Sequence, residues 1–171
     1  MNIHLRSQLR RSTSFLNKKG GRTKPTVSAD YVVGLTDGEG CFFVNVWNTP
    51  TYRAGASVQL HFHIKLQATD KIVLDKVRNT LGCGTVYFQK EKRVNHSQCY
   101  RYSVYNRDEM INILIPFFRQ HPLQGVSKSK SFELFCEVAK LIEAKEHLTK
   151  DGLDKIRILK SGMNKRTVGL A

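Results

Sequence analysis

The sequence predicts an α+β fold in which a four-stranded antiparallel sheet carries helices on one face. Four short segments alternate apolar and polar residues with the period of a strand, in two pairs that turn-forming residues join. Between and after these pairs, apolar residues recur every three or four positions, which is the period of a helix. We find no internal repeat. The 171 residues are therefore expected to form one domain with the element order α-β-β-α-β-β-α-α-α.

The first helix is expected over residues 29–37, where Ser28 provides an N-cap. Strict alternation then predicts strands over 41–47 and 57–66, joined by a turn region that contains Pro50. The apolar face of these two strands consists of Phe42, Val44, Val46, Val58, Leu60, Phe62, Ile64 and Leu66.

The second half of the sheet begins after a helix expected over 70–81, which the segment Gly82-Cys83-Gly84 ends. Strands are expected over 85–90 and 99–105, on either side of a polar loop. The remaining helices are expected over 107–118, where Pro116 interrupts or ends the helix, and over 128–146 and 149–162.

The charge of the chain indicates a polyanionic partner. Lys and Arg number 28 against 14 Asp and Glu, giving a net charge of +14. Nucleic acid is the first interpretation and an anionic membrane surface the second. No apolar run of about 18 residues is present, so no transmembrane helix is expected. The four cysteines form no CxxC pair, and we expect free thiols rather than a structural zinc site.

Half of the net charge lies in residues 1–29, which contain seven Lys and Arg and no acid before position 30. Such a segment is a solvated basic arm, an arm that becomes ordered only on nucleic acid, or a mitochondrial presequence, which is typically rich in Arg and Ser. We therefore divide the chain into this segment, a domain over 30–165 and a tail over 166–171.

The predicted sheet has a polar face that is suited to nucleic acid. It carries hydrogen-bonding and aromatic side chains with almost no acid, and an antiparallel ribbon fits a DNA major groove. An ordinary solvated face is the alternative. His61 and His63 share this face, yet no carboxylate or thiol stands at a useful spacing for a metal site. The residues we predict to bind DNA are Phe43, Asn45, Trp47, Ser57, Gln59, His61, His63, Lys65, Tyr87, Gln89, Arg101 and Ser103.

A nine-residue motif, Val-Val-Gly-Leu-Thr-Asp-Gly-Glu-Gly at 32–40, resembles the signature of the LAGLIDADG homing endonuclease family. Further blocks resemble the family in the expected order over about residues 30–165 and look most like the C-terminal half of two-motif enzymes. They include Leu81-Gly82-Cys83-Gly84, Ile115-Pro116-Phe117-Phe118, His121-Pro122-Leu123 and Met163-Asn164-Lys165. The resemblance implies the αββαββα fold of that family.

The resemblance also implies roles for residues near the motif. Glu39 is expected to be catalytic and to bind Mg²⁺ together with the Gly38 carbonyl, and Lys128 is expected to stand near the scissile phosphate. Val33, Gly34 and Asp37 are expected at the interface with a second motif helix. Asp37 is also expected to accept backbone hydrogen bonds where the helix ends.

Two positions depart from the family pattern. Val33 replaces a small residue of the motif, and Leu66 stands where the family often has a glutamine of the catalytic pocket; Gln67 is next to it, on the opposite face of a regular strand. Lys130 is an alternative to Lys128.

One motif per chain implies that the chain pairs, as a homodimer or with another LAGLIDADG unit. The expected function is Mg²⁺-dependent cleavage of double-stranded DNA in a mitochondrion or another organelle. The alternative is a non-catalytic RNA-binding role, as a splicing maturase or in a ribonucleoprotein such as the mitochondrial ribosome.

Overall fold

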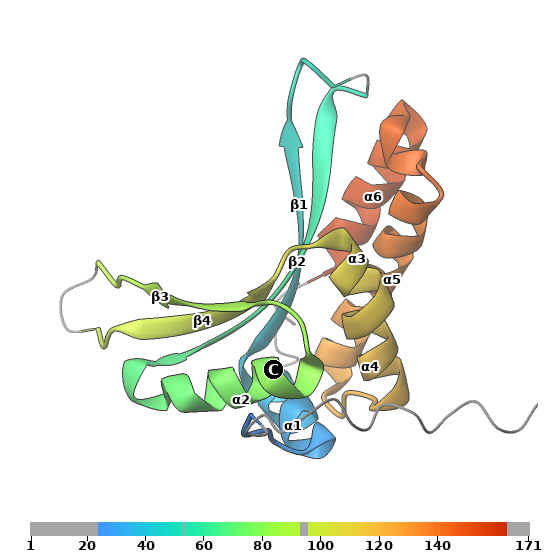
Figure 1. The fold of residues 1–171 in the computed structure, drawn as a ribbon. Coiled ribbons are helices and arrows are strands. Elements are labelled where there is room, and N and C mark those ends of the chain that lie inside the picture. Colours follow the sequence, from blue (N-terminus) through green and yellow to red (C-terminus); the bar gives the residue numbers. More distant parts are fainter. Residues whose placement is uncertain (1–23, 53, 93–95, 164–171) are drawn as a thin grey trace, which may run out of the picture.

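The sheet is bent, and its two hairpins extend in different directions. Our computed structural model describes residues 24–52, 54–92 and 96–163. The hairpin of β1 (Gly40–Asn48) and β2 (Ala56–Gln67) points upward in Figure 1, and the hairpin of β3 (Thr85–Gln89) and β4 (Cys99–Val104) points to the left. The four strands form one antiparallel sheet in the order β1-β2-β4-β3. The predicted fold class is confirmed.

The helices lie on one side of this sheet. The first, α1 (Ala29–Glu39), leads directly into β1, and α2 (Lys71–Leu81) runs along the β3–β4 hairpin. The remaining helices stand beside the β1–β2 hairpin in Figure 1. They are α3 (Arg107–Glu109), α4 (Ile115–Gln120), α5 (Val126–Glu143) and α6 (Lys150–Gly162).

Residues 107–120 form a continuous helical stretch, whereas we expected the helix to be interrupted or to end near Pro116. A π-helical segment, Met110–Leu114, joins α3 to α4, and Pro116 lies in the first turn of α4. Proline cannot donate to the carbonyl four residues earlier, so a regular α-helix would lose that hydrogen bond. The wider π turn just before the proline lets the helix continue to Gln120.

An aromatic cluster holds the helices against the sheet. Phe42 of β1 packs on Phe62 of β2, with ring centroids 4.9 Å apart. It also contacts Phe132 and Phe135 of α5, at 5.1 Å and 5.4 Å. Each of these rings is almost fully buried. Burial of a phenylalanine contributes about 1.5–3 kcal/mol, so this cluster fixes the apolar face of the sheet toward the helices.

The junction between α1 and β1 depends on Gly40. The α1 N-cap is Ser28, as predicted, and the helix extends two residues beyond the expected end, to Glu39. The φ of Gly40 is ordinary, −75°. However, a Cβ at this position would stand 2.7 Å from the Thr36 carbonyl oxygen and 2.8 Å from the Thr36 Cα. Only glycine therefore allows the strand to leave the helix this closely.

The first described residues attach to α2. Thr80 accepts a hydrogen bond from the Val27 amide at 3.0 Å and donates to the Val27 carbonyl at 2.9 Å. Asn79 donates to the Pro25 carbonyl at 2.9 Å. Residues 25–27, which we assigned to the basic arm, thus pack on the domain. The rest of the arm, residues 1–23, and the tail over 166–171 lie outside the described residues.

Within the described ranges, no helix is both long and apolar enough to cross a membrane.

Candidate nucleic-acid interface and catalytic end

The strand register places all of the predicted DNA-binding residues on one face of the sheet, which we call the polar face. Facing pairs on β1 and β2 are Phe43 with His61, Asn45 with Gln59, and Trp47 with Ser57. Across β2, β4 and β3, the register aligns Lys65 with Arg101 and Tyr87, and His63 with Ser103. Because side chains alternate along a strand, these residues share the face that the helices leave uncovered.

Aromatic rings form a row across the middle of the polar face. The rings of Phe43 and His61 lie 6.1 Å apart, and those of His61 and Tyr105 lie 5.0 Å apart, both edge to face. The Tyr87 and Tyr105 hydroxyls are 2.7 Å apart. These contacts hold partly exposed rings in fixed orientations. The side chains would therefore lose less conformational entropy when a ligand binds.

Ser103 requires a correction. We expected its hydroxyl to face nucleic acid, but the residue is only 1% exposed. Its hydroxyl donates to the Tyr87 hydroxyl at 3.4 Å, and the pair Tyr87–Tyr105 covers it. Ser103 therefore supports Tyr87. Sequence alternation places a residue on a face, but it does not reveal which neighbours on that face cover it.

His63 lies close to the end of α1 and remains neutral. It faces Cys41 on β1 and Ser103 on β4. Burial, together with the nearby charges of Arg101, His61 and Lys128, lowers the pKa of His63 to about 4. Near pH 7 the imidazole therefore offers one donor and one acceptor and no charge. Burial also lowers the pKa of His61.

Cys41 occupies the same region and is half-buried. Burial raises the pKa of the Cys41 thiol, although Lys128 and Arg101 oppose the shift. Both cations thus lie within electrostatic reach of the polar face beside α1. We did not select Cys41 as a site residue, although its alternation with Phe42 would have placed it there.

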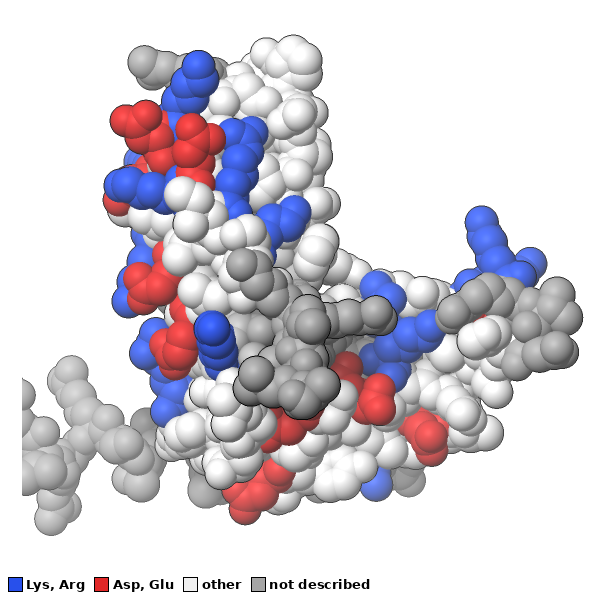
Figure 2. All heavy atoms as spheres, turned by 180° about the vertical axis from the view of Figure 1, so that it is seen from behind, with Lys and Arg blue, Asp and Glu red and all other residues white. Residues whose placement is uncertain are grey.

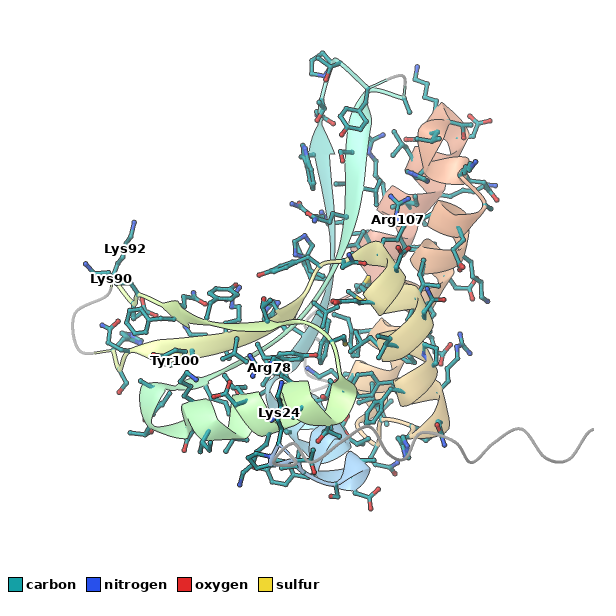
Figure 3. All side chains as sticks on the ribbon, viewed as in Figure 1. Lys24, Arg78, Lys90, Lys92, Tyr100 and Arg107 are labelled. Atoms are coloured by element: carbon teal, nitrogen blue, oxygen red, sulfur yellow. The ribbon has the colours of Figure 1, made fainter. Side chains whose placement is uncertain are left out.

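Charge is distributed unevenly over the molecule. In Figure 2, Lys and Arg intermingle with Asp and Glu over α5 and α6, where Lys140–Glu137, Lys155–Glu146 and Arg157–Asp154 form ion pairs. On the polar face, the Lys65 ammonium lies 3.3 Å from the Glu91 carboxylate. Lys90 and Lys92 stand at the tip of the β3–β4 hairpin in Figure 3, and neither forms an ion pair within the described part of the chain.

The carboxyl end of α1 brings together a carboxylate, helix carbonyls and a lysine. Glu39 is exposed at the last position of the helix. The last carbonyls of a helix have no partner within it, and they give this end a partial negative charge. Lys128 of α5 donates to the Gly40 carbonyl, so its ammonium lies beside the residue that follows Glu39. Lys130 is exposed, and residues two apart on a helix point in different directions.

Asp37 links α1 to the start of α5. Its carboxylate accepts hydrogen bonds from the Gln124 amide at 2.9 Å and the Gly125 amide at 3.1 Å. Asp37 does accept backbone hydrogen bonds, as we expected. Their donors precede α5 and do not belong to the end of α1. These two hydrogen bonds hold the N-terminus of α5, and with it Lys128, against the carboxyl end of α1.

Val33 also requires a correction. We expected it at the interface with a second motif helix, but it is only 7% exposed and lies in the core with Val32 and Thr36. Helical periodicity turns the opposite side of α1 outward, with Tyr31, Gly34 and Gly38 exposed. Apart from the adjoining backbone of α1 itself, no atom of the described residues lies within 4 Å of a Cβ built on Gly34 or Gly38. These two glycines are therefore not required by packing within the chain.

Leu66 occupies the position where the family often has a pocket glutamine, and its surroundings in the structure are apolar. Leu66 faces Tyr100 and packs partly against the core, so its side chain is on the helix-covered face. Gln67 faces Cys99 and lies on the polar face with Lys65. A glutamine side chain therefore exists on the polar face, one residue away from the family position.

The structure adds residues to this face that we did not select. Thr85 faces Ser103 and is exposed, and its alternation with Tyr87 and Gln89 could have identified it. Lys160, at the end of α6, places its ammonium 5.5 Å from the centre of the Phe43 ring. No local pattern in the sequence could predict that contact, since 117 positions separate the two residues.

The donors at the end of α1 fit a hard cation only in part. Among the described residues, no group of three or more His, Cys, Asp and Glu side chains is arranged to hold a metal ion. Mg²⁺ keeps several waters and is commonly bound by one or two carboxylates plus substrate phosphates. One exposed carboxylate beside helix carbonyls therefore fits a Mg²⁺ ion that phosphate and water also bind.

The chain belongs to the LAGLIDADG endonuclease family, because the family model matches residues 32–139. A curated relative, the probable intron-encoded endonuclease 2 of Neurospora crassa, is 33% identical over 134 residues, which are 78% of this chain. The chain spans about a quarter of that relative, 27% of its length.

Solved structures show the same fold. The homing endonuclease I-TnaI is 36% identical, with a TM-score of 0.72 over 82% of this chain and 90% of its own. The homing endonuclease I-SmaMI bound to cleaved DNA is 30% identical, with a TM-score of 0.74 over 86% of this chain and 46% of its own. The chain thus corresponds to nearly all of the first chain and about half of the second.

Proposed function

We propose that the protein is a site-specific endonuclease that cleaves double-stranded DNA as a dimer and requires Mg²⁺. The observation that carries this proposal is the position of Glu39. Glu39 is exposed at the last position of α1, at the edge of the polar face, and the next residue, Gly40, accepts a hydrogen bond from Lys128. A DNA duplex on that face would bring its backbone close to this carboxylate.

Glu39 and the Gly38 carbonyl would bind the metal ion. When bound, Mg²⁺ polarises a phosphoryl oxygen and makes a coordinated water more acidic. The Glu39 carboxylate contributes a hard oxygen ligand and a negative charge at a helix end that already favours cations. Since a single chain offers few ligands, phosphate oxygens complete the site only when DNA is present.

Lys128 would stabilise charge on the scissile phosphate. Without DNA its ammonium donates to the Gly40 carbonyl, which keeps a cation within the site. An ammonium has three donors, so Lys128 can retain this bond and still donate to a phosphate oxygen.

Pairing would use the outer side of α1. Gly34 and Gly38 leave space there that no part of the described chain fills. Glycines four residues apart let a second helix approach closely. A homodimer would present two copies of the polar face related by a two-fold axis, so it would favour a pseudo-palindromic site. With one half-site for each copy, the pitch of DNA gives a site of about 20 base pairs. Pairing with a different LAGLIDADG unit would remove that symmetry.

A second candidate is a non-catalytic RNA-binding role, as a splicing maturase or in a ribonucleoprotein such as the mitochondrial ribosome. Leu66 favours it, because an apolar residue in place of a pocket glutamine removes a group that would orient water. We also propose a mitochondrial location, which the composition of residues 1–29 and the intron-encoded relative support.

The test compares wild type with Glu39→Gln on a randomised duplex library in Mg²⁺. We expect the variant to bind the selected duplex as wild type does and to cleave it about 10³-fold more slowly, because the lost charge acts on the transition state. Glu143→Gln, at the exposed end of α5, is the matched control and should cleave normally. Tight binding of structured RNA by a wild-type protein that never cleaves DNA would favour the second candidate.

A further inference from the structure

A cavity of about 350 Å³ opens beside the β1–β2 hairpin, away from α1. Polar and aromatic residues of the polar face line one side, and apolar residues form the floor. Arg107, at the start of α3, stands on its wall, and Figure 3 shows it in the corner between β2 and the helices. The lining residues that matter here are Ser57, Gln59, Val58, Leu60, Tyr105 and Arg107.

The strand at this cavity has an open edge. β4 pairs with β2 only from Phe62 onward, where Phe62 faces Val104. Between Ala56 and His61, β2 pairs with β1 on one side, and no described strand pairs with it on the other. Backbone amides on that side of a strand point outward. Such amides are common donors to phosphate oxygens in complexes with nucleic acid.

Arg107 supplies a positive charge at the same place. Its side chain is exposed, and it forms no ion pair in the described ranges, although Asp108 follows it in the chain. Its charge also contributes to the lowered pKa of His147, behind burial as the main cause. The cations on α5 and α6 differ, because two of them, Lys140 and Arg157, pair with acids on the same helices.

We propose that this cavity binds the sugar–phosphate backbone of one nucleic-acid strand, with Arg107 as its phosphate contact. The inference rests on the proposed function, since it extends the polar face to the backbone that flanks the bases. Arg107, the outward amides of β2 and the Ser57 hydroxyl would donate to phosphate oxygens. The exposed ring of Tyr105 would contact the sugar, above a floor formed by Val58 and Leu60. The combination of a cation, free donors and an apolar floor matches the alternation of phosphate and sugar along a strand.

The experiment measures binding of the full chain to a mixed-sequence duplex of 30 base pairs at several KCl concentrations, with Ca²⁺ in place of Mg²⁺. Each contact to a DNA phosphate releases about 0.9 of a condensed counterion, so it adds about that amount to the salt dependence of binding. We therefore expect Arg107→Ala to reduce the slope of log K against log [KCl] by about 1 and to weaken binding about tenfold at moderate salt. Arg107→Lys should retain the slope. Arg157→Ala, on the exposed side of α6, is the matched control and should leave slope and affinity unchanged.

The other outcomes distinguish failure of this inference from failure of the proposed function. If wild type binds the duplex and Arg107→Ala keeps its full slope, this inference is wrong and the proposed function stands. If wild type binds no duplex, both are wrong. Arg107→Ala could instead change the mass of the particle in solution and leave the slope of log K against log [KCl] unchanged. That result would show that Arg107 contacts another protein chain, and it would overturn the inference. The same series on single-stranded RNA of equal length shows whether the contact is stronger for duplex DNA or for unpaired RNA.

Discussion

At the scale of single residues, Gly40 decides whether β1 can leave the end of α1 as closely as it does. A methyl group there would meet backbone atoms of Thr36 at 2.7 and 2.8 Å, and backbone cannot move aside as a flexible side chain can. We expect Gly40→Ala to lower the free energy of unfolding by about 1–3 kcal/mol. Gly38→Ala is the control: its Cβ meets no atom of the described residues within 4 Å beyond the adjoining backbone of α1, and alanine favours helix, so stability should be unchanged or slightly higher. Urea unfolding measures both, and equal stability of the two variants would contradict the steric argument.

His63 predicts a pH dependence at the same scale. Its pKa is about 4 in the folded chain and about 6.5 when unfolded. Between these values the unfolded state binds more protons, so the folded state loses stability as the pH falls from about 6.5 to 4. Above pH 6.5 His63 is neutral in both the folded and the unfolded state, so it adds no dependence of stability on pH.

His63→Gln should therefore lose less stability than wild type when the pH is lowered from 6.5 to 4.5, as thermal unfolding would show. His96→Gln, on the exposed loop before β4, is the control and should follow wild type. A His63→Gln profile that parallels wild type throughout this window would contradict the assignment.

At the scale of elements, Asp37 joins α1 to the start of α5, and this link positions Lys128 at the Gly40 carbonyl, directly after Glu39 in the chain. Asp37→Ala removes the acceptor of two amides, at Gln124 and Gly125, and should lower the free energy of unfolding by about 2 kcal/mol. Asp30→Ala, an exposed acid in the first turn of the same helix, should cost less than about 1 kcal/mol. Urea unfolding distinguishes the two, and an equal cost would mean that the bridge contributes no stability.

At the scale of the whole molecule, we expect the outer side of α1 to determine assembly. We expect two chains per particle, twice 19.6 kDa. Gly34→Arg should yield monomers, because the exposed glycine has room for a side chain in one chain but not beneath a second helix. Asn112→Arg adds the same charge at another exposed position and should leave the mass of the particle unchanged. Light scattering with and without duplex DNA measures this; a wild-type chain that stays monomeric in both would contradict homodimer pairing.

The sequence by itself determined the elements and the faces. Alternation at positions such as Phe42 and Phe43 assigned each strand residue to one side of the sheet, because the strand period depends only on backbone geometry. The motif located the exposed Glu39 at the end of a helix by the same kind of local rule, and the family pattern, not local spacing, led to Lys128. The strand register of the structure agrees with each of these face assignments.

Only the tertiary structure decided which of these residues meet. The bond from Lys128 to Gly40, the bridge from Asp37 to Gly125 and the contact of Lys160 with Phe43 each join distant parts of the chain. It also decided which residues are covered: Ser103 lies under Tyr87, and Val33 faces the core. Burial depends on packing between elements, and a local pattern carries the direction of a side chain but not the neighbours that enclose it.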